Sequence, residues 1–157
     1  MPKTATRKSL EPKVFQLGSG AKGDALIGSK CQTCNRVYFP ARDWCAACSK
    51  PTCKSVELSR QGVLRSYALV FRRQSYAVIP IPYLLAEIAL PEGILVYTTL
   101  NLTSTPSTEG PSLTSSIGPD DLGQVQLGTK VTLDPIVVKK DEEGHDLVAY
   151  NFRLVNS

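Results

Sequence analysis

The pattern of apolar and polar positions along this chain predicts β-strands and very little helix. Residues 62 to 72 partly alternate between apolar and polar side chains, and Gly62 permits a sharp turn or bulge at their start. Two further apolar runs, residues 83 to 90 and 94 to 100, flank the short turn Pro91-Glu92-Gly93, which predicts a hairpin. No segment shows a sustained helical period, so we expect helix to be scarce.

The C-terminal part of the chain continues this strand pattern. Residues 127 to 133 and 136 to 138 lead to a charged turn at 141 to 144, and residues 147 to 154 are predicted as the last strand. Five or so short strands suit a small closed barrel, because closure removes exposed strand edges, and the OB-fold is the candidate. Residues 103 to 121 are rich in Ser, Thr, Pro and Gly and predict a long mobile loop.

Four of the five cysteines form two C-x-x-C pairs, Cys31 with Cys34 and Cys45 with Cys48, in a chain with one histidine. Each pair places two thiolates in one tight turn, and two such turns complete a tetrahedral site for Zn²⁺. Four sulfur ligands leave no open position, so the predicted zinc is structural. Two disulfides or a redox C-x-x-C are less favoured, because neither a signal peptide nor a βαβ pattern is evident.

The residues around these pairs allow more than one interpretation. Val37, Tyr38, Phe39 and Trp44 supply the small apolar core that a zinc loop needs. Trp44 either packs on this loop, which is favoured, or stacks on an adenine ring. Cys53 is interpreted as a spare thiol, with a replacement ligand for Cys48 or a nucleophile as the alternatives.

The length and composition predict one ordinary domain preceded by a small metal module. We expect a flexible N-terminal lead over residues 1–25, a zinc ribbon over 26–57 and a β-barrel over 58–157. The longest apolar run, near residues 79 to 90, is broken by Pro80 and Glu87, so no membrane span is predicted. The N-terminal segment lacks the pattern of a targeting signal, and a cytoplasmic protein is expected.

The charges are distributed unevenly along the chain. Residues 30 to 73 hold nine Lys or Arg against Asp43 and Glu57, a net charge of +7, whereas residues 74 to 157 hold four against ten carboxylates, a net charge of −6. A duplex-binding protein is expected to extend a basic face over much of its surface, so one local basic patch fits a compact phosphorylated ligand better.

Several short motifs occur in a fixed order and are spread over most of the chain. They are Gly28-Ser-Lys-Cys31, Cys34, Tyr38-Phe39-Pro40, Arg42, Cys45, Cys48, Leu58-Ser59-Arg60, Gly62, Pro82-Tyr83, Leu90-Pro-Glu-Gly93, Leu127-Gly128, Val131, Asp141-Glu-Glu-Gly144 and Tyr150-Asn-Phe-Arg153. This order resembles a family in which a rubredoxin-like zinc ribbon precedes an OB-fold, encoded beside thiolases and related acyl-CoA enzymes.

The resemblance implies a non-catalytic accessory subunit that binds a thiolase-fold catalytic subunit as a hetero-oligomer and helps to hold or relay the acyl-CoA. The nearest branch is that of thiolase small subunits, which implies thiolytic cleavage of an aromatic acyl-CoA such as benzoylsuccinyl-CoA. The partner is alternatively a synthase or a hydratase. Asn35 replaces the usual glycine after the first cysteine pair, a change that the left-handed conformation tolerates, and residues 103 to 121 are an insertion.

Four basic residues are candidates for contacts with coenzyme A. Arg72 and Arg73 follow the first barrel strand and are the first choice for the phosphates, with Arg60 and Lys130 behind them. The alternative is a solvated strand end. His145 and the acidic residues 141 to 143 are interpreted as an exposed hairpin tip, in preference to a catalytic base or a carboxylate pair.

Two other classes of function stay open. A zinc ribbon and an OB-like barrel also occur in modules that bind single-stranded nucleic acid, but the acidic second half disfavours this alternative. A hydrolase or reductase that uses Cys53 has little support, because no His, Asp or Asn lies near it in sequence.

Overall fold

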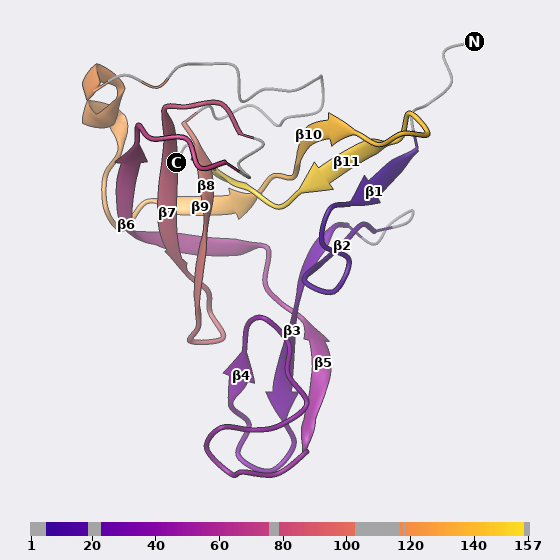
Figure 1. Cartoon of the computed structure of the whole chain (residues 1–157). Helices are drawn as coiled ribbons and strands as arrows, with labels where there is room; N and C mark the ends of the chain where they lie inside the picture. Colours follow the sequence, from indigo (N-terminus) through magenta and orange to yellow (C-terminus); the bar gives the residue numbers. More distant parts are fainter. Residues whose placement is uncertain (1–5, 19–22, 76–78, 103–116, 118, 156–157) are drawn as a thin grey trace.

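The computed structural model describes residues 6–18, 23–75, 79–102, 117 and 119–155. In this part of the chain nearly all regular structure is β-strand, and the only helix is a short 3-10 helix, Pro119–Gln124 (Figure 1). The predicted mainly β class is therefore confirmed. None of the described helices has the length and apolar character that crossing a membrane requires.

A small antiparallel sheet carries the cysteines. Strand β3 (Ala25–Cys31) pairs with β4 (Val37–Tyr38) on one side and with β5 (Cys53–Glu57) on the other. Figure 1 shows these three strands projecting as a lobe below the rest of the molecule. A Cβ atom on Gly28 would lie 2.6 Å from the Tyr38 carbonyl oxygen, so only glycine lets β3 and β4 approach this closely.

The larger unit is a ring of five paired strands. In the order of their pairing these are β12 (Phe152–Leu154), β8 (Leu95–Asn101), β7 (Tyr83–Ala89), β6 (Gln61–Val70) and β9 (Lys130–Leu133), and β9 pairs back with β12. All neighbours are antiparallel except β8 and β12, which are parallel. The hairpin predicted from the turn at Pro91 is present as β7 and β8, whereas assignment to the OB-fold in particular stays a prediction.

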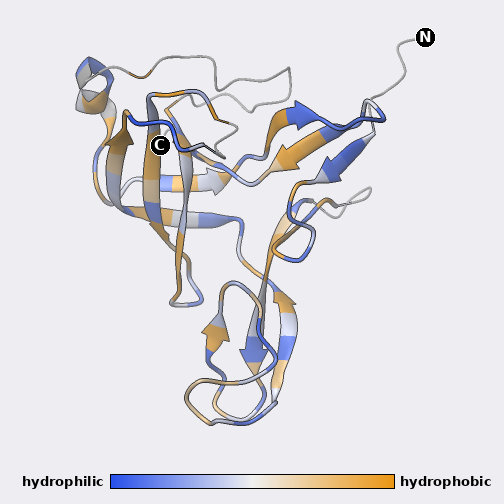
Figure 2. Ribbon diagram, viewed as in Figure 1, coloured by the Kyte–Doolittle hydropathy of each residue, from blue (hydrophilic) through white to orange (hydrophobic). Residues whose placement is uncertain are grey.

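The core of the ring follows from the alternation of side chains along its strands. In β7 the side chains of Leu84, Ala86 and Ile88 are buried, whereas Leu85 between them is 39% exposed. Figure 2 shows the resulting mixture of apolar and polar positions along the strands. The buried cluster also includes Phe15, Leu64, Val96, Leu100, Val131 and Phe152. Truncation of Ile88 to alanine is expected to cost about 2–5 kcal/mol of stability.

The N-terminal segment differs from the flexible lead expected over residues 1–25. Strand β1 (Arg7–Ser9) pairs in parallel with β11 (Asp146–Ala149), and β2 (Phe15–Gln16) pairs with β3. The Phe15 side chain is fully buried in the core. The free energy gained by burying its apolar surface stabilises the ordered conformation of this segment. Residues 1–5 and 19–22 lie outside the described part of the chain.

The predicted last strand, residues 147 to 154, is divided between two sheets. Strand β11 joins β10 (Ile136–Lys140) and β1 in a three-stranded sheet, whereas β12 belongs to the five-strand ring. Asn151 lies between them and is fully buried, with its Nδ2 donating to the carbonyl of Phe152 and its Oδ1 accepting from the Thr99 hydroxyl. These bonds satisfy polar groups at the point where the chain leaves one sheet for the other.

The long loop predicted at residues 103 to 121 falls largely on positions outside the described residues, namely 103–116 and 118. Its end is described and begins the 3-10 helix Pro119–Gln124.

Candidate functional site

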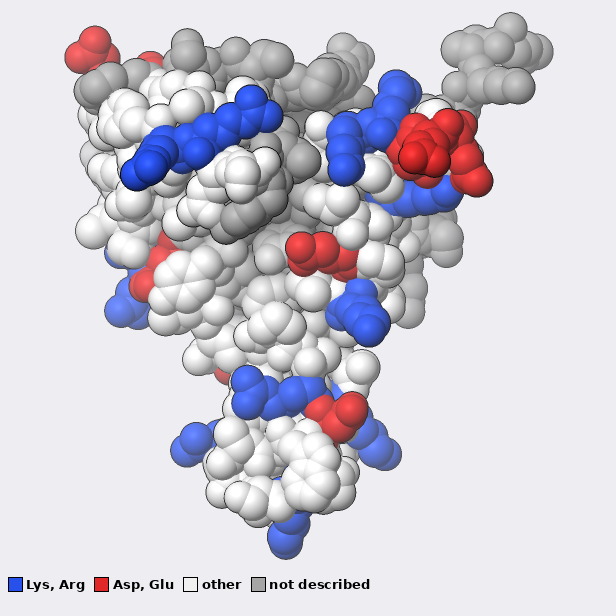
Figure 3. All heavy atoms as spheres, viewed as in Figure 1, with Lys and Arg blue, Asp and Glu red and all other residues white. Residues whose placement is uncertain are grey.

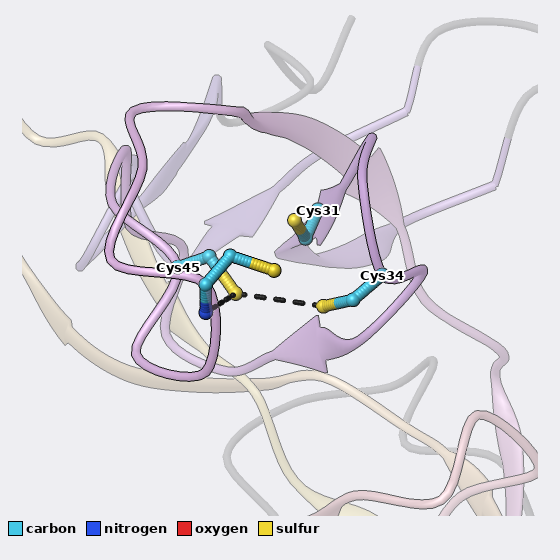
Figure 4. A group of neighbouring side chains, drawn as sticks. Cys31, Cys34 and Cys45 are labelled. Atoms are coloured by element: carbon cyan, nitrogen blue, oxygen red, sulfur yellow. Dashed lines mark hydrogen bonds between the residues drawn. The ribbon is translucent and has the colours of Figure 1, made fainter.

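The four cysteines of the two C-x-x-C pairs lie together at the end of the ribbon. The sulfur atoms of Cys31, Cys34, Cys45 and Cys48, which we call the sulfur cluster, all lie within 4.8 Å of one another. The Cys34 and Cys45 sulfurs are 3.6 Å apart. Figure 4 shows Cys31 and Cys34 pointing from one side, and Cys45 from the other, toward the same space.

The two turns that carry the sulfurs have the same hydrogen-bond pattern. In the first, the Asn35 amide donates to the Cys31 carbonyl (3.0 Å), and in the second the Ser49 amide donates to the Cys45 carbonyl (2.9 Å). Asn35 and Ser49 both have positive φ, 60° and 54°, which lets the chain turn back directly after each pair. The left-handed conformation expected for Asn35 is thus confirmed.

Backbone and hydroxyl donors surround the buried sulfurs. The Thr33 amide lies 3.4 Å from the Cys31 sulfur, and the Cys48 amide lies 3.4 Å from the Cys45 sulfur. The Thr52 hydroxyl, 3.1 Å from the Cys31 sulfur, is the main reason that the pKa of Cys31 falls to about 5. The Tyr38 hydroxyl, 3.2 Å from the Cys45 sulfur, likewise lowers the pKa of Cys45.

The four thiols are not equivalent. A hydrogen bond with the Cys34 sulfur, followed by burial, raises the pKa of Cys48 to about 12, whereas the pKa of Cys31 is lowered. Four soft donors with no oxygen ligand among them fit Zn²⁺ in a closed tetrahedral site, which supports a structural zinc.

Trp44 is not packed on the zinc loop, which was its favoured interpretation. Its side chain is 61% exposed, whereas Tyr38 is partly buried beneath the Arg42 guanidinium, which lies 4.5 Å from the centre of the Tyr38 ring. Tyr38 also binds the Cys45 sulfur, so it fills the position beside the cluster that Trp44 was expected to share. Trp44 is left as a large apolar group on the surface of the ribbon.

Cys53 lies outside the sulfur cluster but directly opposite one of its members. In the pairing of β3 with β5, Cys53 is the partner of Cys31. Burial, followed by the charge of Cys31, raises the pKa of Cys53, so this thiol is protonated near neutral pH. That state agrees with a spare thiol and disfavours a catalytic nucleophile.

The four basic residues predicted to contact coenzyme A are not gathered in one place. Arg60 precedes β6, and Lys130 is the register partner of Val63 near the same end, whereas Arg72 and Arg73 lie beyond the other end of β6. A strand of ten residues spans roughly 30 Å at about 3.3 Å per residue. Two separate pairs of basic residues result.

The Arg60 guanidinium is already engaged. Its Nε donates to the Asp24 carbonyl at 2.7 Å and its Nη2 to the Gly23 carbonyl at 2.9 Å. These bonds hold the segment before β3 against the start of β6, which explains the position of Arg60 without a ligand. Arg72 and Arg73 are exposed beside Phe71, whose side chain is 62% exposed.

The hairpin tip between β10 and β11 carries a second group of charged side chains. The Lys8 ammonium lies 3.0 Å from carboxylate oxygens of both Asp141 and Glu143, and His145 Nδ1 lies 3.0 Å from Asp141 Oδ2. Figure 3 shows acidic side chains crowded beside basic ones at the place that this hairpin tip occupies in Figure 1. The expected hairpin tip is present, and Lys8 from β1 forms salt bridges with its carboxylates.

A pocket that the sequence analysis did not anticipate lies between β7 and β8 of the ring and the three-stranded sheet. Its volume is about 220 Å³ and it is lined by Leu10, Glu11, Phe15, Ile79, Tyr83, Leu85, Thr98, Thr99, Val148, Ala149 and Tyr150. Neither lysine nor arginine is among these residues. Its walls come from four distant segments, so no local signal in the sequence reveals it.

Comparison with known proteins identifies the cysteine-bearing segment. Residues 20–55 match the model of the ChsH2 rubredoxin-like zinc ribbon domain. This segment is similar to zinc ribbons of the ChsH2 type. The resemblance stated from the sequence is thereby confirmed, and the ribbon has the paired turns and sulfur cluster that the name describes.

Curated relatives extend the similarity beyond the ribbon. A DUF35 domain-containing scaffold protein of Methanocaldococcus jannaschii is 36% identical over 43% of this chain, a match that spans 49% of that relative. A scaffold protein of the same description from Methanothermobacter thermautotrophicus is 28% identical over 82% of this chain and 84% of its own length. The BbsA subunit of benzoylsuccinyl-CoA thiolase from Thauera aromatica is 27% identical over 92% of this chain and 86% of BbsA.

Among solved structures, an Ltp2-ChsH2(DUF35) aldolase covers 83% of this chain with a TM-score of 0.58 and 24% identity, over 84% of that chain. This likeness concerns the fold.

Proposed function

We propose that this chain is a non-catalytic accessory subunit in acyl-CoA metabolism that binds a thiolase-type catalytic subunit. The observation that carries the proposal is the alignment with BbsA, which extends over 92% of this chain and 86% of that thiolase subunit. The relatives described as scaffold proteins support an assembling role for the same kind of chain.

The chemistry of the described residues agrees with a subunit that does not itself catalyse. Four cysteines belong to the sulfur cluster, and Cys53 is held as a protonated thiol. His145 is engaged by carboxylates at the hairpin tip, where Lys8 also binds. Within the described ranges, these contacts leave no nucleophile paired with a free base, so the partner supplies those groups.

Two surfaces expose large apolar side chains on which a partner can dock. One is Trp44 on the ribbon, and the other is the outer face of β7 and β8, where Tyr97 is 59%, Leu95 41% and Leu85 39% exposed. Tryptophan and tyrosine are enriched among the residues that dominate binding energy at protein interfaces. Zinc in the sulfur cluster would fix the ribbon that presents Trp44.

The proposed ligand contact involves fewer residues than the four basic residues expected from the sequence. Arg72 and Arg73 are exposed and are the candidates for the phosphates of an acyl-CoA, because guanidinium groups bind phosphate with paired hydrogen bonds. Arg60 is omitted, since two backbone carbonyls already hold its guanidinium through Nε and Nη2. An aromatic acyl group is the finer proposal that the BbsA alignment supports.

The experiment that tests the proposal is affinity purification of the chain from its native cells, followed by size exclusion and identification of any protein that stays bound. A thiolase-fold subunit in fixed ratio is expected, with thiolysis or its reverse measurable only in the complex. Trp44→Ala should weaken the complex, whereas Leu127→Ala, which alters a residue that is 63% exposed, serves as the matched control. Recovery of the chain alone would count against the proposal.

Binding of single-stranded nucleic acid is the second candidate, supported by the closed five-strand ring next to a zinc ribbon. Its weakness is the net charge of −6 over residues 74 to 157. Fluorescence anisotropy with a labelled oligonucleotide distinguishes the two candidates, because a nucleic-acid module must show binding that weakens steeply with salt.

A further inference from the structure

Cys53, the thiol that is not part of the sulfur cluster, lies next to a member of that cluster because β3 pairs with β5. Cys31 and Cys53 are directly opposite in this antiparallel pair. The Cys31 amide donates to the Arg36 carbonyl and the Cys53 amide to the Asp43 carbonyl, so neither amide bonds across the pair. The Gln32 amide, one residue after Cys31, donates to the carbonyl of Thr52, one residue before Cys53, at 2.8 Å.

This hydrogen-bond pattern defines a non-hydrogen-bonded pair, the narrow kind in an antiparallel ladder. Opposite Cα atoms in such a pair are about 4.5 Å apart, and their side chains lie on the same face of the sheet. A disulfide requires Cα atoms about 4.4–6.8 Å apart. The backbone at Cys31 and Cys53 is therefore arranged for a bond between the two sulfurs.

We propose that Cys31 and Cys53 form a disulfide in competition with the metal, so that Cys53 is an oxidation site that controls whether the sulfur cluster can hold zinc. Because only a thiolate can serve as a sulfur ligand, the disulfide removes Cys31 from the ligand set. Three sulfurs then remain, too few for the closed site that stabilises the ribbon.

The oxidant is a small disulfide such as oxidised glutathione. Cys53 is partly exposed and Cys31 is fully buried, so the first reaction takes place at Cys53. The Cys53 thiol gives up its proton as its sulfur attacks one glutathione sulfur, which forms a mixed disulfide and releases the other glutathione as a thiolate that takes up a proton. The Cys31 thiolate then attacks the Cys53 sulfur and expels the second glutathione. Two protein thiols are oxidised and one glutathione disulfide is reduced to two thiols.

Two cysteines are candidates to bond the Cys31 sulfur. Cys34 lies in the same turn, and its sulfur is within 4.8 Å of the Cys31 sulfur. Cys53 faces Cys31 across the sheet in a register fixed by five residue pairs of β3 and β5. This inference uses the ribbon alone and is independent of the role in acyl-CoA metabolism.

The test is to treat the purified chain with oxidised glutathione and to measure two quantities. Tandem mass spectrometry of proteolytic peptides locates the partner of Cys31, and a colorimetric chelator follows zinc release. We expect Cys31 to be linked mainly to Cys53, and zinc to leave in step with this link and to rebind after reduction.

The Cys53→Ser variant keeps all four cysteines of the cluster and serves as the control. It should contain zinc as purified and release it several-fold more slowly under the same treatment. Cys53→Ala gives the same comparison if the serine variant folds poorly. Linkage of Cys31 to Cys34, or equal rates of zinc release with and without Cys53, would overturn the proposal. The mapping result stands even if the chain is isolated without zinc.

Discussion

The carboxylate of Glu92 binds Ser59 twice, through the Ser59 amide at 2.6 Å and the Ser59 hydroxyl at 2.8 Å. Glu92 lies in the turn between β7 and β8, and Ser59 lies in the short link between the ribbon and the five-strand ring. The turn depends on Gly93, whose φ of +82° suits glycine. This contact between residues 33 positions apart holds the segment that follows the ribbon against the ring.

Removal of this contact should loosen the junction between ribbon and ring. Hydrogen bonds to a charged group contribute about 1.5–3 kcal/mol each, so Glu92→Ala should lower the free energy of unfolding by about 2 kcal/mol or more. Ser59→Ala removes only the hydroxyl donor, a single bond to the carboxylate, and should cost about 1.5 kcal/mol. Urea unfolding of both single variants and the double variant measures the coupling. Strictly additive losses would contradict a direct interaction between the two side chains.

Loss of one buried sulfur should release the metal. Cys45 is 1% exposed and is bound by the Tyr38 hydroxyl and the Cys48 amide. We expect Cys45→Ser to reduce the zinc content, measured by elemental analysis, from one ion per chain to nearly none, because three thiolates do not close the tetrahedral site. Chelation of the wild type should reproduce the effect. Cys53→Ser is the matched control and should retain zinc. Equal losses of zinc in both variants would show that the ligands proposed here are wrong.

The features predicted correctly from the sequence are those that local chemistry determines. The spacing of the cysteines indicated two tight turns, and the same hydrogen bonds close both of them at Asn35 and Ser49. The turn at Pro91-Glu92-Gly93 between two apolar runs indicated the β7–β8 hairpin. In each case the determining residues lie within a few positions of one another, so the pattern is visible in a short window.

The features that were missed depend on contacts between distant segments. Phe15 is one aromatic residue in a polar stretch, and only its burial against the core turns the expected lead into ordered strands. Arg60 resembles a phosphate ligand in sequence, but its Nε and Nη2 bind the carbonyls of Asp24 and Gly23. Trp44 is exposed because Tyr38 takes the place beside the sulfurs. No periodicity or spacing encodes such pairings.

The charged group at the hairpin tip predicts a pH-dependent stability. Desolvation opposes ionisation of Asp141, but the Lys8 ammonium and His145 outweigh it and hold the pKa of Asp141 below its usual value. A lowered pKa stabilises the fold above the unfolded-state value, near pH 4, and the contribution is lost as the pH falls through the folded-state pKa. Glu143, followed by Asp141, raises the pKa of Lys8, so its contribution persists until strongly alkaline pH.

We therefore expect Asp141→Asn to be less stable than the wild type between about pH 5 and 9, with the difference shrinking toward acid. Thermal unfolding across this range measures it. Glu142→Gln alters an exposed neighbour in the same turn and should show little change at any pH. Because the contacts are exposed to solvent, added salt should also reduce the Asp141→Asn effect. A difference that grows as the pH falls would contradict this assignment of the charges.

Replacement of Arg72 and Arg73 together by alanine should weaken binding of coenzyme A, if the exposed end of β6 provides the phosphate contacts. Each lost charge-assisted contact is worth about a tenfold change in affinity or slightly more, so calorimetry should show a decrease of tenfold to a hundredfold. Arg65→Ala, on the exposed face of the same strand, is the matched control for loss of positive charge. Arg60→Ala should leave the affinity unchanged but destabilise the chain, because its guanidinium binds Gly23 and Asp24. An equal loss of affinity in the Arg65 and Arg72/Arg73 variants would indicate general electrostatic attraction instead of a specific site.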